Sequence, residues 1–330
     1  MKRIFLKAVL AAAAAGLSVC ALAQDYPLAK PVTVIVPYGA GGGTDALARL
    51  VAKELGARMN QSFVVENVAG AGGVIGTQKA MAAPADGYTL LVGSGSELEI
   101  TRLTDPAAVP GRWTPLAALG LIGTQPMVLV GKAALPFNTT DQLIEHLRQH
   151  PGSLSYASAG VGTQLHLLGE LTQQVGAFGM VHVPYKSGAQ IATDLVGGHV
   201  DLAVMVLPTV LAQIKAGKVK AFGVSDNVRS AAAPEVPTLN ESRYLDDVDM
   251  KVWYGLFAPA GTPPAVGQAI ARQMVAVLQA PEVKAKLADL AITPAADTSP
   301  AALAALKQSQ LARIGKVIEA TKRASPSTTK

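Results

Sequence analysis

Two glycine-rich loops hold the residues best suited to bind a charged ligand. Residues 36–45 follow an apolar strand and lead directly into an amphipathic helix. Residues 157–163 repeat the same order of strand, small-residue loop and helix. The first N–H groups of a helix have no acceptor within the helix, and glycine lets a ligand approach the main chain closely. Since neither loop contains Lys or Arg, both predict an anion site built from backbone N–H groups.

The first residues of the two helices support this interpretation. Thr44 occupies the position of an N-cap, and Asp45 falls in the first turn, where a carboxylate interacts favourably with the helix dipole. Thr163 is the N-cap candidate of the second helix. If the two units belong to different domains, their loops form opposite walls of one cleft, beyond the carboxyl ends of the strands. The alternative is that each loop is a tight turn with an ordinary helix cap.

Motifs for catalysis or for metal binding are lacking in the sequence. There is no Gly-x-Ser-x-Gly or His-Glu-x-x-His motif, and the five histidines are scattered, so we expect neither an enzyme nor a metal or cofactor. Residues 39–44 approximate a dinucleotide fingerprint, and Glu66 ends the next strand, which leaves a dinucleotide-dependent oxidoreductase as a remote alternative. Thr44 replaces the third glycine of that fingerprint.

The first 23 residues have the pattern of a secretory signal peptide. Basic residues begin it, residues 8–19 form a short apolar core, and Ala21-Leu22-Ala23 is a typical cleavage site. We therefore expect export to the periplasm with cleavage after Ala23. Cleavage removes three of the 28 basic residues and leaves 25 against 23 acidic ones, a net charge of +2. So small a charge gives no support for nucleic-acid binding.

Short apolar runs alternate with helical patterns along the rest of the chain, which is typical of an α/β fold. Strands are expected at residues 33–36, 63–66, 89–92, 127–130, 155–156, 180–183, 202–206, 221–224 and 254–258. Helices are expected at residues 45–59, 76–82, 140–150, 163–175, 189–197, 207–216, 264–279, 281–290 and 300–320.

Seven segments in order resemble the solute receptors of tripartite tricarboxylate transporters, the Bug family of periplasmic binding proteins. The segments are VPYGAGGGTD (36–45), VENVAGAGGVIG (65–76), PADGYTLL (84–91), SAGVGTQLHL (158–167), HVPYKSGA (182–189), PEVPT (234–238) and YGLFAPAGTPP (254–264). The resemblance covers nearly the whole mature chain. It implies a two-lobed α/β Venus flytrap in which each lobe has a central mixed sheet flanked by helices. Lobe 1 would comprise residues 24–125 plus 226–330, and lobe 2 residues 126–225.

The resemblance also implies a function. A monomeric receptor would capture a small organic carboxylate between its lobes and deliver it to the membrane permease subunits of a tripartite tricarboxylate-type transporter. A binding protein that signals to a membrane sensor remains the alternative. The residues expected to bind the ligand are Tyr38, Gly39, Ala40, Gly41, Gly42, Thr44, Asp45, Ser94, Ala157, Ser158, Ala159, Gly160, Thr163 and Met205.

Two departures from the family pattern bear on the ligand. Met205 and Val206 stand where many relatives carry Asp-Asn, which predicts an apolar wall. Glu97 and Glu99 lie where relatives often have Thr-His; they either face the cleft or face solvent. A carboxylate near the cleft disfavours a second ligand carboxylate and favours an ammonium or amide group. We therefore expect a monocarboxylate with an apolar or aromatic body, or with an amino or amide group, rather than a citrate-like tricarboxylate.

Overall fold

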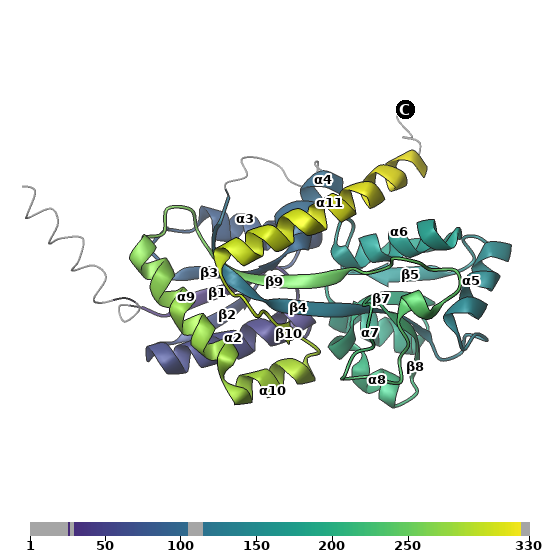
Figure 1. The fold of residues 1–330 in the computed structure, drawn as a ribbon, viewed down its shortest axis with the longest axis horizontal. Coiled ribbons are helices and arrows are strands. Elements are labelled where there is room, and N and C mark those ends of the chain that lie inside the picture. Colours follow the sequence, from purple (N-terminus) through teal and green to yellow (C-terminus); the bar gives the residue numbers. More distant parts are fainter. Residues whose placement is uncertain (1–25, 27–29, 105–114, 325–330) are drawn as a thin grey trace, which may run out of the picture.

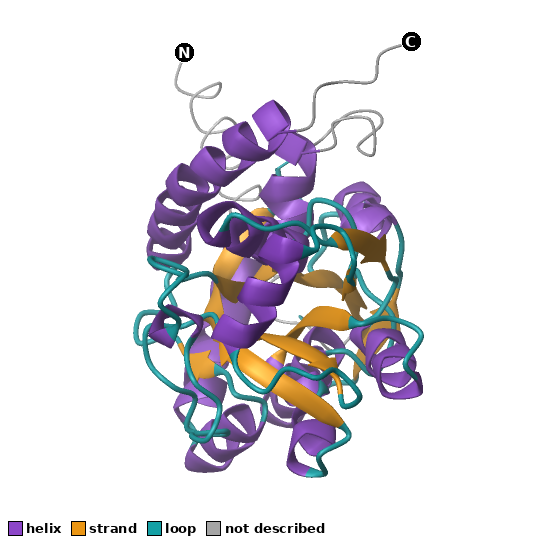
Figure 2. Cartoon of the chain, turned by 90° about the vertical axis from the view of Figure 1, so that its right-hand side faces the viewer, coloured by secondary structure: helices purple, strands orange, loops and turns teal. Residues whose placement is uncertain are grey.

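The chain folds into two α/β lobes that lie side by side, as expected from the sequence (Figure 1). The computed structural model describes residues 26, 30–104 and 115–324. The signal peptide expected at residues 1–23 lies outside the described residues. Seen along the long axis, helices surround the strands (Figure 2). The two-lobed fold class is thereby confirmed.

Lobe 1 is built on a mixed sheet. Its strands are β1 (Val32–Val36), β2 (Phe63–Asn67) and β3 (Thr89–Ser94), which are parallel, and β9 (Lys251–Ala258), which is antiparallel to β3. Its helices are α2 (Gly43–Met59), α3 (Val74–Ala82), α9 (Pro264–Gln279) and α10 (Pro281–Asp289). A π-helical turn, η2 (Ser96–Ile100), and the short α4 (Thr101–Thr104) follow β3. Leu47, Val51 and Leu55 form the apolar face of α2 and are fully buried, as their helical spacing predicts.

Lobe 2 has a second mixed sheet. Its strands are β5 (Ser155–Ser158), β6 (Val181–Pro184), β7 (Leu202–Val206) and β8 (Val219–Val224). Its helices are α5 (Thr140–Gln149), α6 (Gln164–Gly176), α7 (Gly188–Gly197) and α8 (Leu211–Lys215), with the short turns η4 (Leu207–Thr209) and η5 (Leu239–Glu241). β5 pairs in parallel with both β6 and β7, so α6 and α7 start at the same edge of this sheet.

One long strand, β4 (Ala117–Lys132), joins the two sheets. It pairs with β9 as far as Pro126 and with β7 and β8 from Met127 onward. It also pairs with the short β10 (Thr293–Pro294). Ser225 ties this crossing together, because its hydroxyl accepts from Met127 N at 3.0 Å and donates to Met250 O at 2.6 Å.

Two further segments cross or border the lobes. Residues 226–250 run along lobe 2, where Ser242 Oγ donates to Asp141 at 2.6 Å and Tyr244 OH donates to Glu145 at 2.9 Å, both carboxylates being on α5. The last helix, α11 (Pro300–Ala324), extends from lobe 1 toward α6 of lobe 2 (Figure 1). Gln310 of α11 accepts from Gln164 Nε2 at 3.3 Å.

Four expectations about the elements are wrong. The helix α2 starts at Gly43 with Gly42 as its N-cap, so Thr44 lies inside the first turn instead of capping it. The strand expected at 254–258 begins at Lys251, which brings Trp253 into β9. The helix expected at 207–216 divides into η4 and α8. The first part of β4 was not expected, because its glycines weaken the strand pattern.

Close contacts explain glycine in β4. A Cβ at Gly123 would lie 2.4 Å from Thr293 O, on the neighbouring strand β10. The pairing of β4 with β9 also shifts register on both sides of Gly120.

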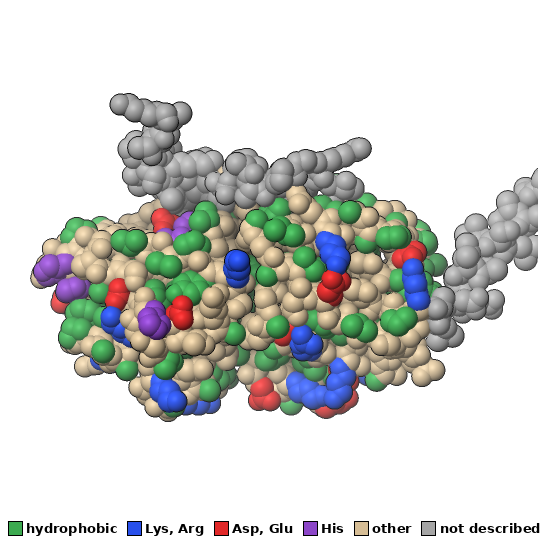
Figure 3. Space-filling model, turned by 180° about the vertical axis from the view of Figure 1, so that it is seen from behind, with side chains coloured by type: hydrophobic (Ala, Val, Ile, Leu, Met, Phe, Trp, Pro, Cys, Tyr) green, Lys and Arg blue, Asp and Glu red, His purple; other side chains and the backbone are tan. Residues whose placement is uncertain are grey.

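Charged side chains are mixed in sign over the surface. On the face seen in Figure 3, Lys and Arg are interspersed with Asp and Glu. Opposite charges form ion pairs, such as Lys30 Nζ–Asp86 Oδ2 at 2.8 Å and Lys286 Nζ–Glu54 Oε1 at 3.0 Å. Within the ranges that the structure describes, no helix is both long enough and apolar enough to cross a membrane.

Candidate ligand-binding site between the lobes

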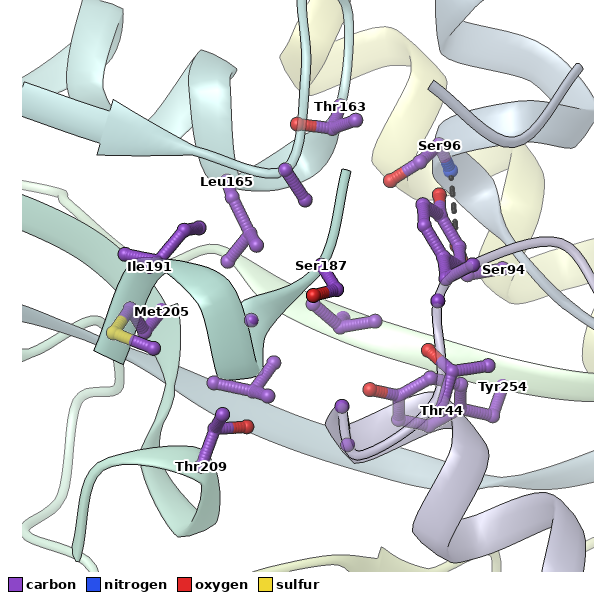
Figure 4. A pocket seen from close by; sticks show the side chains of 18 residues that line it. Thr44, Ser94, Ser96, Thr163, Leu165, Ser187, Ile191, Met205, Thr209 and Tyr254 are labelled. Carbon is purple, nitrogen blue, oxygen red and sulfur yellow. Dashed lines mark hydrogen bonds between the residues drawn. The ribbon is translucent and has the colours of Figure 1, made fainter. Parts of the chain in front are cut away.

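A pocket lies between the lobes, where α2, α6 and α7 begin (Figure 4). Its volume is about 60 Å³, and since about 10–15 Å³ holds one water, it suits a small molecule. Residues from both lobes line it: Tyr38, Gly39, Gly42, Gly43, Thr44, Ser94, Ser96, Ala159, Thr163, Leu165, Ser187, Gly188, Ile191, Met205, Val206, Thr209, Val252 and Tyr254. None of these residues is Asp, Glu, Lys, Arg or His.

The starts of three helices converge on this uncharged pocket. No side chain caps α2 at Gly42, whereas Thr163 caps α6 by accepting from His166 N and Ser187 caps α7 by accepting from Gln190 N. The capping function predicted for Thr163 is therefore confirmed. A single cap satisfies one of the first-turn N–H groups, so each helix directs further donors and the positive end of its dipole toward the pocket. This arrangement attracts an anion without a cationic side chain.

The two sides of the pocket differ in chemistry. Leu165, Ile191 and Met205 form an apolar wall from lobe 2 (Figure 4). The opposite wall, from lobe 1, presents hydroxyl groups. This wall, which we call the hydroxyl wall, consists of Tyr38, Thr44, Ser94, Ser96 and Tyr254.

Asp45 holds the first loop from behind. Its carboxylate accepts from Gly41 N at 2.9 Å, from Arg49 Nε at 3.0 Å and from Asn67 Nδ2 at 3.0 Å. Burial raises the pKa of Asp45, but these hydrogen bonds outweigh it and leave the pKa below its usual value. Asp45 is thus an ionised support of the loop and does not line the pocket.

Two neutral histidines support the second loop. Ser158 Oγ lies 2.7 Å from His182 Nε2, and Gly162 N donates to His166 Nδ1 at 3.2 Å. Burial lowers the pKa of His182 to about 3, with a smaller contribution from His166, and burial also lowers the pKa of His166. Gly160 and Gly162 adopt positive φ angles of 122° and 75°, which glycine tolerates best.

Glu97 lies behind the hydroxyl wall, neither in solvent nor in the pocket. It is fully buried and accepts from Tyr38 OH at 2.8 Å, from Ser94 Oγ at 2.7 Å and from Ser94 N. Burial raises the pKa of Glu97 to about 7, although these hydrogen bonds act in the opposite direction. Glu99, the other acid considered from the sequence, pairs with Lys307 of α11 at 2.8 Å. The sequence analysis expected these acids to face either the cleft or solvent. Glu97 faces neither, so both expectations are wrong for this residue.

Contacts between the lobes surround the pocket. Gln164 N at the start of α6 donates to Ser96 Oγ of lobe 1 at 2.9 Å. Gly39 N in the first loop lies 3.5 Å from Lys186 O of lobe 2. A Cβ at Gly43 would lie 2.7 Å from Val206 Cγ2 across the gap. The lobes therefore touch on several sides of the pocket, in a closed arrangement.

The structure brings together eight of the fourteen residues selected from the sequence. These are Tyr38, Gly39, Gly42, Thr44, Ser94, Ala159, Thr163 and Met205. The other six do not line the pocket: Ala40 and Gly41 are exposed on the first loop, while Asp45, Ala157, Ser158 and Gly160 are buried behind the walls.

Ten of the lining residues were not among those fourteen, although the sequence analysis had predicted an apolar wall that includes Val206 and a binding loop that includes Gly43. They are Gly43, Ser96, Leu165, Ser187, Gly188, Ile191, Val206, Thr209, Val252 and Tyr254. Ser187-Gly188 carried a usable signal, because it forms a third unit of strand, small-residue loop and helix. Tyr254 carried none, since its position depends on how β9 pairs with its neighbours.

Comparisons with known proteins agree with this architecture. A family model described as "Tripartite tricarboxylate transporter family receptor" matches residues 47–322. Protein BugT of Bordetella pertussis (strain Tohama I) is 35% identical over 283 residues, covering 86% of this chain and 86% of BugT. The solved periplasmic binding protein BugD is 31% identical, with a TM-score of 0.82 over 91% of this chain and 98% of BugD. MatC from Rhodopseudomonas palustris, solved with bound malate, is 27% identical, with a TM-score of 0.83 over 89% of this chain and 100% of MatC.

The family resemblance seen in the seven sequence segments is thus confirmed over most of the chain. The chain belongs to the tripartite tricarboxylate transporter receptor family, the Bug family of periplasmic solute-binding proteins.

Proposed function

We propose that this protein is exported to the periplasm, binds a small organic carboxylate between its lobes and delivers it to the permease subunits of a tripartite tricarboxylate-type transporter. The observation that carries the proposal is the convergence of three helix starts on a pocket without charged side chains. The bound malate in MatC supports a carboxylate as the class of ligand. The signal pattern of residues 1–23 supports export.

The carboxylate would lie between the starts of α2 and α7. A Cβ placed on Gly42 would approach Gly188 N to 3.9 Å, so these two backbones face each other across a narrow gap. Thr209 Oγ1 lies beside the start of α7 and is buried without a hydrogen-bond partner. A buried polar atom of this kind is normally satisfied, and a ligand oxygen would satisfy it. Backbone N–H groups, the hydroxyls of Ser187 and Thr209 and bridging water would then hold the anion.

We propose that lobe 1 comprises residues 24–125 plus 251–330 and that lobe 2 comprises residues 126–250. Residues 226–250, which the sequence analysis placed in lobe 1, would then belong to lobe 2. The packing of residues 226–250 on α5 supports this division. The strand β4 and the Ser225 contacts would form the hinge, because they connect the two sheets.

Titration calorimetry on the mature protein tests the proposal. The panel contains mono-, di- and tricarboxylates, amino acids and aromatic acids, each compared with its neutral primary amide. We expect at least one carboxylate to bind, its amide to bind far more weakly, and the ligand to be recovered unchanged. Amides that bind as tightly as the acids would contradict an anion site. Chemical conversion of the ligand would contradict a receptor role.

Delivery has a separate test. Uptake of the labelled ligand is measured in cells that contain the permease subunits, with and without this protein. Uptake that does not depend on the protein would contradict delivery while leaving carboxylate binding intact.

A further inference from the structure

The hydroxyl wall is joined to acceptors that lie behind it. Tyr38 OH and Ser94 Oγ both donate to Glu97, at 2.8 and 2.7 Å. An ionised carboxylate has no proton to donate, so both hydroxyl protons must point away from the pocket. Glu97 therefore sets the direction of the Ser94 hydrogen bond, and at Tyr38 it acts together with Gly72 O, a second acceptor 3.2 Å from the Tyr38 hydroxyl.

Tyr254 is oriented in the same way by a different acceptor. Its hydroxyl donates to Gln125 Oε1 at 2.7 Å, and Gln125 Nε2 donates to Leu290 O at 2.5 Å. Because a backbone carbonyl can only accept, the Gln125 amide has one orientation, with its oxygen toward Tyr254. The Tyr254 proton is thus also directed away from the pocket.

Three of the five hydroxyls of the wall, those of Tyr38, Ser94 and Tyr254, thus direct their protons into the protein. At these three positions the ligand meets oxygen lone pairs.

We propose that Tyr38, Ser94 and Tyr254 of the hydroxyl wall act as hydrogen-bond acceptors that select carboxylates bearing a hydroxyl, amino or amide N–H group, and that Glu97 is the positioning residue that sets this polarity at Tyr38 and Ser94. The inference rests on the proposed carboxylate receptor and specifies its substrate class. The carboxylate end would lie at the starts of α2 and α7, the apolar body against Leu165 and Met205, and the donor group against the hydroxyl wall.

This selection differs from attraction to a negative charge. Glu97 is fully buried and does not line the pocket. A neutral hydroxyl on the ligand therefore gains affinity by donating a hydrogen bond to the wall, as an ammonium group does. A ligand without a donor leaves buried lone pairs unpaired, which corresponds to a loss of about 5- to 100-fold in affinity.

Protonation of Glu97 would relax the selection. A protonated carboxyl donates one hydrogen bond, so it can donate to Tyr38 or Ser94 and release one hydroxyl proton. The titratable groups that interact electrostatically with Glu97 are Tyr38 of the first loop and Tyr254 of β9. Both tyrosines are neutral throughout this pH range.

Calorimetry with matched ligands tests the proposal on the mature protein at pH 8. The series are butyrate, 4-hydroxybutyrate and 4-aminobutyrate; benzoate, 4-hydroxybenzoate and 4-aminobenzoate; and succinate, malate and succinamate. In the series that binds, we expect the donor-bearing members to bind about 10-fold more tightly or better than the unsubstituted acid. The preference should shrink at pH 5.5.

Two variants separate the effect of Glu97 from a general change in charge. In E97Q the amide can donate to the wall, so the preference should fall by about 10-fold. E99Q removes the same charge two residues away, beside Lys307, and should keep the wild-type preference. If E97Q does not fold, the comparison of wild type at pH 8 and pH 5.5 gives the same test.

The possible results separate the acceptor wall from the receptor function. Carboxylates that bind without donor preference, a preference for ammonium ligands alone, or an unchanged preference in E97Q would each overturn the acceptor wall and leave the receptor function standing. If no carboxylate binds, the proposed function fails and the inference fails with it.

Discussion

At the scale of single residues, Thr209 and Glu97 say most about what the pocket accepts. Thr209 has a buried hydroxyl without a partner at the start of α7. Glu97 has the opposite condition, a buried carboxylate with three donors whose pKa is nevertheless raised to about 7 by burial. The Thr209 hydroxyl thus lacks a hydrogen bond in the protein, and at Glu97 the effect of burial outweighs that of the hydrogen bonds. An unpaired buried hydroxyl and a buried carboxylate both lower the stability of the fold, so both indicate a role in binding.

Replacing Thr209 by Val should have opposite effects on binding and stability. The valine keeps the shape but removes the unpaired hydroxyl, so the free energy of unfolding without ligand should stay equal or rise by about 1 kcal/mol. Affinity should fall by about 5- to 10-fold, because one hydrogen bond to the ligand is lost. Calorimetry and urea unfolding measure the two quantities. Thr193→Val is the control, since Thr193 is exposed and donates to Ala189 O within α7; equal affinities of T209V and wild type would contradict the prediction.

Glu97 should make stability depend on pH. The folded protein holds the Glu97 proton up to about pH 7, whereas the unfolded chain releases it near pH 4.5. The free energy of unfolding should therefore decrease as the pH rises from 4.5 to 7, by about 3 kcal/mol from this group.

The measurement is the difference between wild type and E97Q in urea unfolding from pH 4.5 to 8. Taking the difference cancels the opposite effect of His182, whose low pKa costs stability as the pH falls below 6.5. A difference that stays constant over this range would show that Glu97 does not titrate there.

At the scale of elements, the site consists of helix starts held by buried supports. The α2 loop rests on Asp45, and the α6 loop rests on Ser158 and on the ring of His166. The sequence analysis had placed Asp45 and Ser158 among the residues expected to bind the ligand. They fix the loops, which leaves the backbone N–H groups in place before a ligand arrives.

Replacing Gly42 by Leu should abolish binding and leave the fold intact. Gly42 has a φ of −84°, which any L residue adopts, and a Cβ there has no neighbour closer than 3.7 Å. The leucine side chain would fill the gap between α2 and α7, so affinity should fall by more than about 100-fold while Tm stays nearly unchanged.

Gly160 provides the contrast. Its φ of 122° strains any other residue, so Gly160→Leu should lower Tm as well as affinity. If Gly42→Leu retained wild-type affinity, the carboxylate would not lie between α2 and α7.

At the scale of the whole molecule, binding depends on how closely the lobes approach. Gln164 reaches from α6 to Ser96 of lobe 1, to Lys251 O at the crossing and to Gln310 of α11. A single residue at the pocket thus contacts both lobes and the helix that spans them. Closure and ligand binding are expected to be coupled, because the closed state alone provides contacts from both sides.

Replacing Gly43 by Ala should oppose closure. The new methyl group would lie 2.7 Å from Val206 Cγ2, a distance that forces α2 and β7 apart. We expect affinity to fall about 10-fold or more, and small-angle scattering to show a larger radius of gyration with ligand than wild type has. The double variant Gly43→Ala/Val206→Ala removes the opposing methyl group and should recover closure. No recovery in the double variant would show that the lobes are not held apart by this contact.

The sequence by itself determined the parts of this protein that depend on near neighbours in the chain. The strand and helix on either side of each glycine-rich loop, the cap at Thr163 and the acid in the first turn of α2 all follow from residues a few positions apart. The family assignment also follows, because seven short segments occur in order along the chain. Local spacing, propensity and capping carry this information within one turn or one strand.

Only the tertiary structure decided which residues face the ligand. Asp45 lies in the first turn of α2, at the site, yet its carboxylate accepts from Asn67 of β2 and supports the loop instead of facing the pocket. Tyr254 enters the pocket because β9 pairs with both β3 and β4, and Glu97 is buried because Tyr38, 59 residues away in the chain, covers it. The third helix start, at Gly188, joins the other two through the parallel pairing of β5, β6 and β7. Contacts between residues far apart in sequence depend on register and lobe closure, and no local pattern encodes either.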